Sequence, residues 1–420
     1  MIKFGKTVVK FRIPILILSF LLLIPAGISY INTRINYDIL SYLPGDIDTM
    51  KGQDILLEDF GTGAFSLCVV EDMSEKQVVD LENEIKGVEH VKDVIWYDTL
   101  ADISIPMDVL PSEIKDAFNN EDKNATLMIV TFDTSMSADE TLDAIEQLRT
   151  LTKQQCFMSG MSAVVTAIAY VILAAGLSAV VLALTMDSFL VPVFFLLSIG
   201  MAIIYNLGTN FVSGEISFIT QALAAVLQLA VTMDYSIFLW HSYQENQERF
   251  PGDKKRAMAH AISNTVSSVV ASSVTTVAGF VAMCFMTFTL GLDLGIVMAK
   301  GVVLGVLCCV TVLPAMILTF DGALEKTRHR ALIPKFDKMG TFATRKFPIF
   351  LVLFVVILIP AVYGYRNTNV YYDLAGTLPA DLESVQANNK LEEDFNMGAT
   401  HIILASSDLS HKDASNMIDE

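Results

Sequence analysis

An aspartate and a tyrosine stand side by side in a stretch that is otherwise almost entirely apolar. The stretch is QLAVTMDYSIFLW (residues 228–240), and the pair is Asp234 and Tyr235. A carboxyl group among apolar residues is costly to bury when it is charged and much less costly when it is protonated. Reversible proton binding is therefore the chemistry that this pair can perform, provided that the stretch crosses a membrane. In that case we expect Asp234 to face the interior of the helix bundle, where it would find a partner.

Hydroxyl side chains recur every three or four residues in a second apolar stretch, SVVASSVTTVAGFVAM (residues 268–283). This spacing places them along one side of a helix, together with Thr265 and Gly279. The hydroxyl residues of this stripe are Ser268, Ser272, Thr275 and Thr276. We expect them to hydrogen-bond Asp234 or to hold a file of water beside it. The alternative is that small residues here let two helices pack closely.

Three further polar residues lie in apolar stretches. Gln228 lies about one and a half helical turns before Asp234 and would extend the polar path toward the outer side. His241 lies at the inner end of the same stretch, where it would pass protons onward or simply mark the membrane boundary. Lys300 lies near the outer end of another stretch, so we expect it to extend toward the outer interface rather than to pair with Asp234.

Composition indicates that these stretches lie in a membrane. The chain of 420 residues is 53 % hydrophobic and 18 % charged, with a mean hydropathy of +0.51, whereas soluble domains are usually about a quarter charged. Seven apolar runs have the length, about 20 residues, that a bilayer requires. They are residues 12–31, 162–184, 189–208, 217–241, 263–287, 294–319 and 347–366.

Basic residues indicate the orientation of these spans. Lys and Arg clusters precede the first span and lie between the fourth and fifth and between the sixth and seventh spans. Positive charge marks the cytoplasmic side, so residues 32–158 and 367–420 are expected outside a cell membrane that the chain crosses several times. Residues 32–158 contain 26 acidic and 9 basic residues, a net charge of −17, which argues against nucleic-acid partners.

The external stretch alternates strands with helices. Predicted strands cover residues 64–70, 88–97 and 125–133, and predicted amphipathic helices cover residues 74–87 and 138–151. This order predicts an α+β ferredoxin-like porter domain with helices on one face of the sheet. Cys68 and Cys156 fall in predicted strands of this domain. Buried thiols are the favoured interpretation, and a disulfide between them is the alternative.

The sequence repeats itself after a shift of 335 residues. From Tyr37 to Ala64, 11 of 28 positions are identical to their counterparts, so the seventh span begins a second copy of the first span and its external domain. Parallel repeats of this kind are typical of transporters. We expect the chain to be the first half, and the beginning of the second, of a protein of about 700 residues. The alternative is a natural short form. The second half would act in cis or be replaced by a copy in a homo-oligomer.

The spans and the repeat together predict the organisation of an α-helical polytopic membrane protein. Its expected parts are the cytoplasmic N-terminus with the first span (1–31), the porter domain (32–158), the second to sixth spans (159–319), a cytoplasmic linker (320–346), the seventh span (347–366) and an incomplete second porter domain (367–420).

This layout resembles the resistance-nodulation-division (RND) superfamily, and within it the MMPL branch of hydrophobe and lipid exporters. The motifs that carry the resemblance are VTMDYSIFLWHSYQE (231–245), SVVASSVTTVAGFVAM (268–283) and LGIVMAKGVVLGVLCCVTVLPAMIL (294–318). The resemblance implies that Asp234 and Tyr235 form a proton relay, which works with an equivalent pair in the second half. It also implies export of hydrophobic or amphipathic molecules, such as lipids or drugs, by proton antiport. The implied partners are that substrate, protons and membrane lipids.

Several function classes have no signature in the sequence. It contains no Gly-rich phosphate loop, no Ser/His/Asp or Cys/His set and no metal-ligand spacing. We therefore expect neither an enzyme nor a bound metal or cofactor, and a proton gradient rather than ATP as the energy source. Two alternative functions remain open: a protein-export accessory similar to SecDF, and a lipid-sensing protein similar to Patched that transports nothing.

Overall fold

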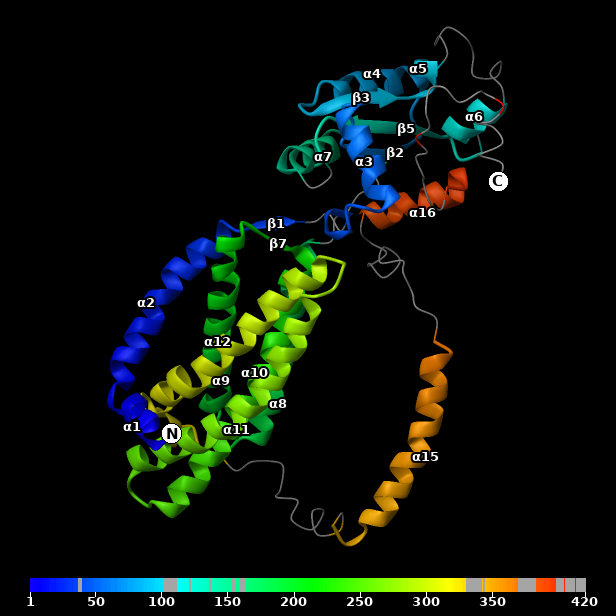
Figure 1. Ribbon diagram of the computed structural model, residues 1–420. Helices are drawn as coiled ribbons and strands as arrows, with labels where there is room; N and C mark the ends of the chain where they lie inside the picture. The colour runs from blue at the N-terminus through cyan, green and yellow to red at the C-terminus, as the bar shows by residue number, and fades with distance from the viewer. Residues whose placement is uncertain are drawn as a thin grey trace. The chain divides into compact units, whose positions relative to one another are not determined.

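The computed structural model forms two compact units, which are described here one at a time (Figure 1). The first unit contains residues 1–36 and 164–374, and the second contains residues 37–163 and 375–420. The structure describes residues 1–36, 40–100, 112–120, 122–135, 138–152, 156–158, 164–329, 342, 344–368, 383–397, 404 and 412.

The first unit is built from long apolar helices. They are α2 (Arg12–Ile31), α8 (Val164–Thr185), α9 (Leu190–Gly208), α10 (Phe218–Arg249), α11 (Lys254–Met283), α12 (Leu290–Thr319) and α15 (Phe347–Arg366), preceded by the short α1 (Ile2–Lys10). Each predicted span corresponds to one of the long helices, so the prediction of a multi-pass helical membrane protein is confirmed. Six of them are long and apolar enough to cross a membrane, and α8 contributes a shorter apolar helix over Ile172–Thr185.

Helix α12 lies at the centre of the bundle and packs against α2, α9, α10 and α11 (Figure 1). Glycines on α12 make this close packing possible. At Gly305 a Cβ atom would stand 2.0 Å from Thr232 Cγ2 of α10, and at Gly301 it would stand 2.6 Å from Asn206 Nδ2 of α9. No side chain fits in that space, so these two positions allow α9 and α10 to approach α12.

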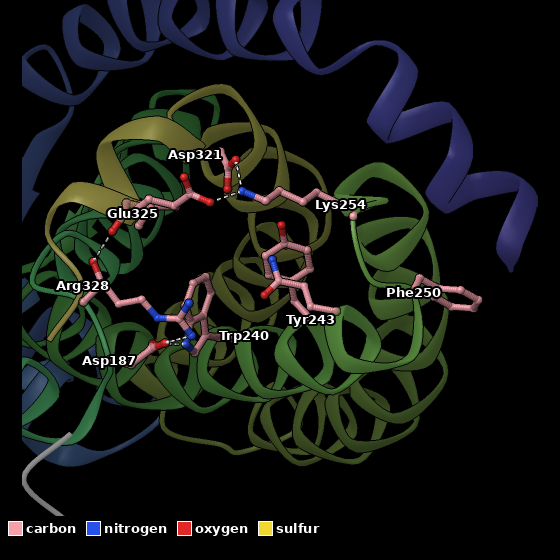
Figure 2. A pocket seen from close by; sticks show the side chains of 12 residues that line it. Asp187, Trp240, Tyr243, Phe250, Lys254, Asp321, Glu325 and Arg328 are labelled. Atoms are coloured by element: carbon pink, nitrogen blue, oxygen red, sulfur yellow. Dashed lines mark hydrogen bonds and ion pairs between the residues drawn. The ribbon is translucent and has the colours of Figure 1, made fainter. Parts of the chain in front are cut away.

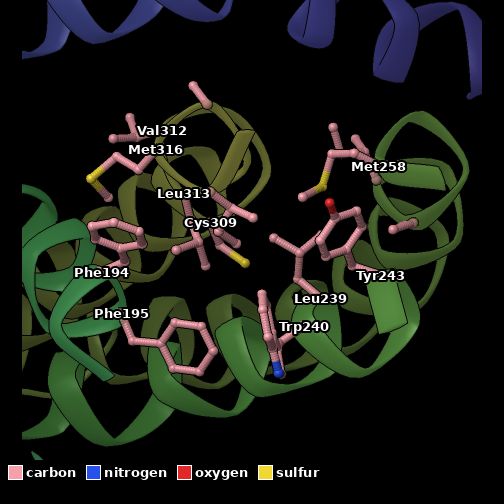
Figure 3. Packing of buried hydrophobic residues seen from close by; sticks show 14 of the residues in the cluster. Phe194, Phe195, Leu239, Trp240, Tyr243, Met258, Cys309, Val312, Leu313 and Met316 are labelled. Carbon is pink, nitrogen blue, oxygen red and sulfur yellow. The ribbon is translucent and has the colours of Figure 1, made fainter. Parts of the chain in front are cut away.

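A hydrophobic core fills the cytoplasmic half of the bundle (Figure 3). Phe195 of α9, Leu239 of α10 and Leu313 of α12 are each completely or almost completely buried there. Met258 of α11 closes the core from another side. Lipid tails are as apolar as these side chains, so close van der Waals packing rather than transfer from water holds the four helices together in this core.

A short parallel strand pair closes the outer end of this unit. Strand β1 (Arg34–Asn36) follows α2 and pairs with β7 (Glu215–Ser217), which directly precedes α10. The Ser217 side chain caps α10 by accepting a hydrogen bond from the Ile219 amide, and the Ser217 amide donates to Asp293 Oδ2 of α12 at 3.0 Å. The residue that caps α10 is therefore fixed both to β1, which follows α2, and to α12.

The second unit contains an antiparallel sheet with the strand order β3-β5-β2-β6. The strands are β2 (Ala64–Glu71), β3 (Val91–Ile95), β5 (Ala125–Phe132) and β6 (Cys156–Met158), with the two-residue β4 (Asn119–Asn120) beside β5. The helices are α3 (Asp48–Glu58), α4 (Glu75–Lys86), α5 (Tyr97–Leu100), α6 (Ser112–Phe118), α7 (Asp139–Thr152) and α16 (Glu383–Phe395). With α4 and α7 connecting the strands, this is the predicted ferredoxin-like order.

Both faces of this sheet are covered, although helices were predicted on one face only. Alternate residues of β2 and β5 point to opposite faces. One set, which includes Val70 and Val130, packs with α4 and α7. The other set packs against Leu391 and Phe395 of α16, a helix from the second copy of the repeat. The prediction was incomplete because it treated each copy as a closed domain.

The two cysteines of this unit are buried in neighbouring strands. Cys68 lies in β2 opposite Met158, and Cys156 of β6 lies opposite Val70. Both side chains are at most 2 % exposed, and no disulfide joins these two described residues. The favoured interpretation of buried thiols is therefore the correct one.

Candidate functional site

Asp234 lies near the middle of α10, on the side of this helix that the rest of the unit leaves exposed. Among the described residues it has no hydrogen bond or ion pair. The exposed residues that share its side of α10 are Leu223, Val226, Ala230, Phe238 and His241. Their spacing of three or four residues defines one straight stripe along the helix, which we call the Asp234 stripe.

This position differs from the expectation that Asp234 faces the interior of the bundle. The interior lies on the other side of α10, where α9 and α12 pack. Tyr235 is one residue further, about 100° around the helix, and its side chain is only 7 % exposed, in the core with Leu239 and Trp240. The two members of the predicted relay therefore point to different sides of α10, one outward and one inward.

Most of the predicted hydroxyl stripe of α11 is exposed as well, but Thr265, at its cytoplasmic end, is completely buried. Ser268, Ser272 and Thr275 are exposed and Thr276 is half-buried. The Thr275 and Thr276 hydroxyls donate to the Ser272 carbonyl oxygen at 2.7 and 3.3 Å, so they bond within their own helix and not to Asp234.

Helix geometry nevertheless places the α11 hydroxyls at the depth of Asp234. Helices α10 and α11 pack against each other and are joined by residues 250–253. Asp234 and Ser268 each lie about four helical turns from this connection, on antiparallel helices. The two are therefore at a similar height in the membrane, and both are exposed in this chain.

His241 is also on the Asp234 stripe. It is exposed and lies seven residues after Asp234, which returns to almost the same side of the helix about 10 Å nearer the cytoplasm. Phe238 is the large side chain between them on the stripe, 43 % exposed. A proton leaving Asp234 along this side of α10 would therefore reach His241 only after passing an apolar ring.

Gln228 does not belong to this side of the helix. Its side chain is 1 % exposed and lies about 120° around α10 from Asp234. It accepts a hydrogen bond from Asn206 Nδ2 of α9 at 3.0 Å. The Thr232 hydroxyl donates to the Gln228 carbonyl oxygen, and the Ser236 hydroxyl donates to that of Thr232. Gln228 is thus part of a buried polar face of α10, separate from the Asp234 stripe.

A charged network at the cytoplasmic end of α10 was missed in the sequence. Trp240 Nε1 donates to Asp187 Oδ1 at 3.2 Å, and Asp187 Oδ2 lies 3.4 Å from an Arg328 guanidinium nitrogen (Figure 2). Lys254 Nζ lies 2.5 Å from carboxylate oxygens of both Asp321 and Glu325. These residues come from three separate connections of the chain, so their sequence spacing carries no signal.

This network closes the cytoplasmic end of the helices around a small cavity. The cavity has a volume of about 150 Å³ and is lined by residues that include Trp240 and Tyr243 (Figure 2). The short helix α13 (Asp321–Lys326) supplies the two carboxylates that bond Lys254. The Lys254 ammonium holds the pKa of Glu325 below its ordinary value. The cytoplasmic segment after α12 is therefore attached to the start of α11 and, through Asp187, to α10.

The Asp234 stripe and the neighbouring side of α11 present one carboxyl group and several hydroxyl groups on the exposed side of their helices. Asp234 supplies the carboxyl group, and the hydroxyls of Ser268 and Ser272 supply neutral donors and acceptors at similar depth. Within the described part of the chain, no three His, Cys, Asp or Glu side chains are placed to hold a metal ion.

Known proteins resemble this chain over most of its length. The family model described as "MMPL family" matches residues 69–346. A putative membrane protein, MJ1562 of Methanocaldococcus jannaschii, is 24 % identical over 357 residues, which cover 73 % of this chain and 90 % of that protein. The probable transport protein MmpL12 of Mycobacterium tuberculosis is 25 % identical over 331 residues. They cover 72 % of this chain but only 28 % of MmpL12.

Solved structures give a weaker similarity. The crystal structure of SecDF, a translocon-associated membrane protein from Thermus thermophilus, aligns with 16 % identity and a TM-score of 0.44. The alignment covers 75 % of this chain and 38 % of SecDF. The family match covers more than half of the chain and includes Asp234 and the α11 stripe. This chain belongs to the MMPL family.

Proposed function

We propose that this chain is the proton-binding half of a transporter that exports hydrophobic or amphipathic molecules, such as lipids or drugs, by proton antiport. The observation that carries the proposal is the exposed position of Asp234 at the middle of a membrane-spanning helix. A charged residue facing lipid at that depth costs about 2.5–3.5 kcal/mol. The Asp234 stripe is therefore best explained as a contact face for a second bundle, supplied by a second half of the protein or by a second copy.

Protonation of Asp234 would change the contact between the two bundles. The neutral acid can stay in a closed, water-poor contact, whereas the carboxylate requires water or hydrogen-bond donors. Ser268 and Ser272 can donate to the carboxylate from α11, whereas Tyr235 stays packed in the core and would hold α10 in place beside it. Each protonation state would thus favour a different arrangement of α10 and α11 against the second bundle.

The route of the proton would lead toward the cytoplasm along α10. His241 is on the same stripe and can accept a proton at its cytoplasmic end. Substrate would enter from the outer leaflet or from between helices, and membrane lipids are the surrounding partners. The name of the relative MmpL12, "probable transport protein", supports transport, and the motifs around Asp234 support protons as the driving ion.

The test is proton-coupled transport by the complete protein in liposomes. In the Asp234→Asn variant, substrate-dependent proton uptake under an imposed pH gradient is expected to fall to the level of empty liposomes. The matched control is Glu248→Gln, the same change at an exposed carboxylate near the cytoplasmic end of α10, and it should retain transport. Full proton uptake by Asp234→Asn would refute the proposal.

The Asp234→Asn variant and cells without the protein distinguish the two alternative functions. A lipid-sensing protein similar to Patched would leave both proton uptake and efflux unchanged in Asp234→Asn. A protein-export accessory similar to SecDF would be indicated if cells without the protein accumulate unprocessed secretory proteins while lipid and drug efflux stays normal.

A further inference from the structure

A second polar site lies inside the bundle, between α9, α10 and α12, away from the Asp234 stripe. It contains Lys300 of α12, Asn206 of α9, Asn210 in the turn after α9, and Gln228 of α10. The three amide side chains are 0 %, 2 % and 1 % exposed, in that order, and Lys300 is half-buried. Lys300 donates a hydrogen bond to Asn210 Oδ1, and Asn206 donates to Gln228.

Lys300 is the basic group of this site, and it lies deeper than its sequence position suggested. Helix α12 begins at Leu290 rather than at the predicted residue 294, so Lys300 lies about 15 Å along the helix from its outer end. Its ammonium group contacts a neutral amide, and it forms no ion pair with any residue in the described ranges. The acidic residue of α12, Asp293, accepts a hydrogen bond from the Ser217 amide.

The amide side chains leave buried hydrogen-bonding atoms without a partner. Asn210 Nδ2, Gln228 Nε2 and Asn206 Oδ1 are each buried, and no described residue bonds them. Flipping the side-chain amides of Asn206 and Gln228 would exchange the nitrogen and oxygen atom of each. One donor and one acceptor would still be left without a hydrogen bond. Because such atoms cost about 1–3 kcal/mol each when buried, the number of them at one place is significant.

Gly301 brings these groups close to one another. A Cβ atom at this position would lie 2.6 Å from Asn206 Nδ2 and 3.0 Å from Gln228 Oε1. The backbone next to Lys300 therefore lies directly against the two amides, and the Lys300 side chain continues from there to Asn210.

We propose that this site binds an anionic group, a carboxylate or a phosphate, near the outer end of the bundle. The Lys300 ammonium would supply the charge, and the Asn210 and Gln228 amide nitrogens would supply two neutral donors. A cation does not fit, because the ammonium group lies in the site. The same chemistry is offered by the headgroup of an anionic amphiphile and by a small free anion. The site does not use Asp234, so it goes beyond the proposed proton coupling.

The test is binding of defined probes to the purified chain in a neutral detergent. The probes are dodecanoate, dodecanol as its uncharged counterpart, and inorganic phosphate. Dodecanoate is expected to bind saturably, and Lys300→Met should weaken that binding about tenfold to a hundredfold, whereas Lys300→Arg should stay close to wild type. Gln228→Leu should weaken it less. Asp234→Asn should bind normally, which separates this proposal from the proton relay.

A measurement on the unmodified sequence makes the result independent of how the variants fold. Reductive methylation of lysines is followed by mass spectrometry, with Lys255, an exposed residue at the start of α11, as the reference. Dodecanoate should protect Lys300 and leave Lys255 reactive. Protection by dodecanoate alone assigns the site to an amphiphile, and protection by phosphate as well assigns it to free anions. Equal effects of dodecanol and dodecanoate, or no protection by any probe, would overturn the proposal.

Discussion

The two polar sides of α10 differ in whether their polar groups have hydrogen-bond partners. The buried side carries neutral groups, Gln228, Thr232 and Ser236, and each forms a hydrogen bond to α9 or within α10. The exposed side carries Asp234, the carboxyl of the apolar part of this helix, with no partner among the described residues. One helix thus separates neutral polar groups that hydrogen-bond within the bundle from a carboxyl group that has no partner in the described part of the chain.

This difference indicates where in a helix bundle a titratable residue can be placed. A buried carboxyl would have to be paired permanently or kept neutral, and either condition would prevent it from cycling. A carboxyl on an outer contact face can be covered and uncovered as two bundles move. The buried side is therefore expected to determine stability, and the exposed side is expected to determine activity.

The largest effect on stability is expected at Gly305 of α12, the glycine against which the buried side of α10 packs. In Gly305→Ala the new Cβ would stand 2.0 Å from Thr232 Cγ2, so the helices must separate, at a cost of about 2–3 kcal/mol of unfolding free energy. The control is Gly279→Ala on α11, where nothing lies within 4 Å. There the change is expected to be neutral or stabilising by about 0.5 kcal/mol. Thermal unfolding of both variants in detergent measures these changes in unfolding free energy. Equal stabilities of the two variants would contradict the prediction.

A smaller effect is expected from the amide pair on the buried side. Gln228→Leu leaves the Asn206 amide buried without its partner and should cost about 1–2 kcal/mol. Replacing both Asn206 and Gln228 by Leu should cost clearly less than the sum of the two single changes. Asp234→Leu, on the exposed side, should leave stability unchanged. If the double variant shows simple additivity, the hydrogen bond between the amides has no energetic role.

The smallest effect is expected at the cytoplasmic end, where both sides of α10 leave the membrane. Lys254 lowers the pKa of Glu325, so the ion pair stabilises the fold above the ordinary pKa of a glutamate. That contribution is lost as the pH falls through the lowered value. Between about pH 5 and pH 3 the unfolding temperature should decrease less in Lys254→Gln than in wild type. Because these charges are exposed, the difference should be small and should shrink further in high salt.

Much of the fold could be predicted because hydrophobic periodicity is a local signal. The strand predicted at 125–133 and the helix predicted at 74–87 correspond to β5 (Ala125–Phe132) and α4 (Glu75–Lys86) within one residue at each end. The covering of the second sheet face by α16 could not be predicted in this way. It joins residues that are more than 250 positions apart, and neither segment carries a signal for the other.

The residue types of the candidate site could be predicted from the sequence, but the side of each helix on which they lie could not. Asp234 and the α11 hydroxyls are conspicuous in apolar stretches, yet the sequence does not say which side of α10 meets α12. Gly301 and Gly305 could have indicated the contact side of α12, because glycines four residues apart mark the side of a helix that a neighbour approaches closely. Asn206 and Asn210 have the same spacing in or just after the third span and indicate the buried polar site.

The parallel pair of β1 and β7 links the start of α10 to the point where the chain leaves the first unit. Asn36 is the last residue before the chain enters the second unit, and it is paired with Ser217, the residue that caps the start of α10. An axial displacement of α10 would therefore be transmitted to Asn36, where the chain leaves the first unit. Because the two strands are held together by main-chain atoms, substitutions of the surrounding side chains would leave this attachment in place.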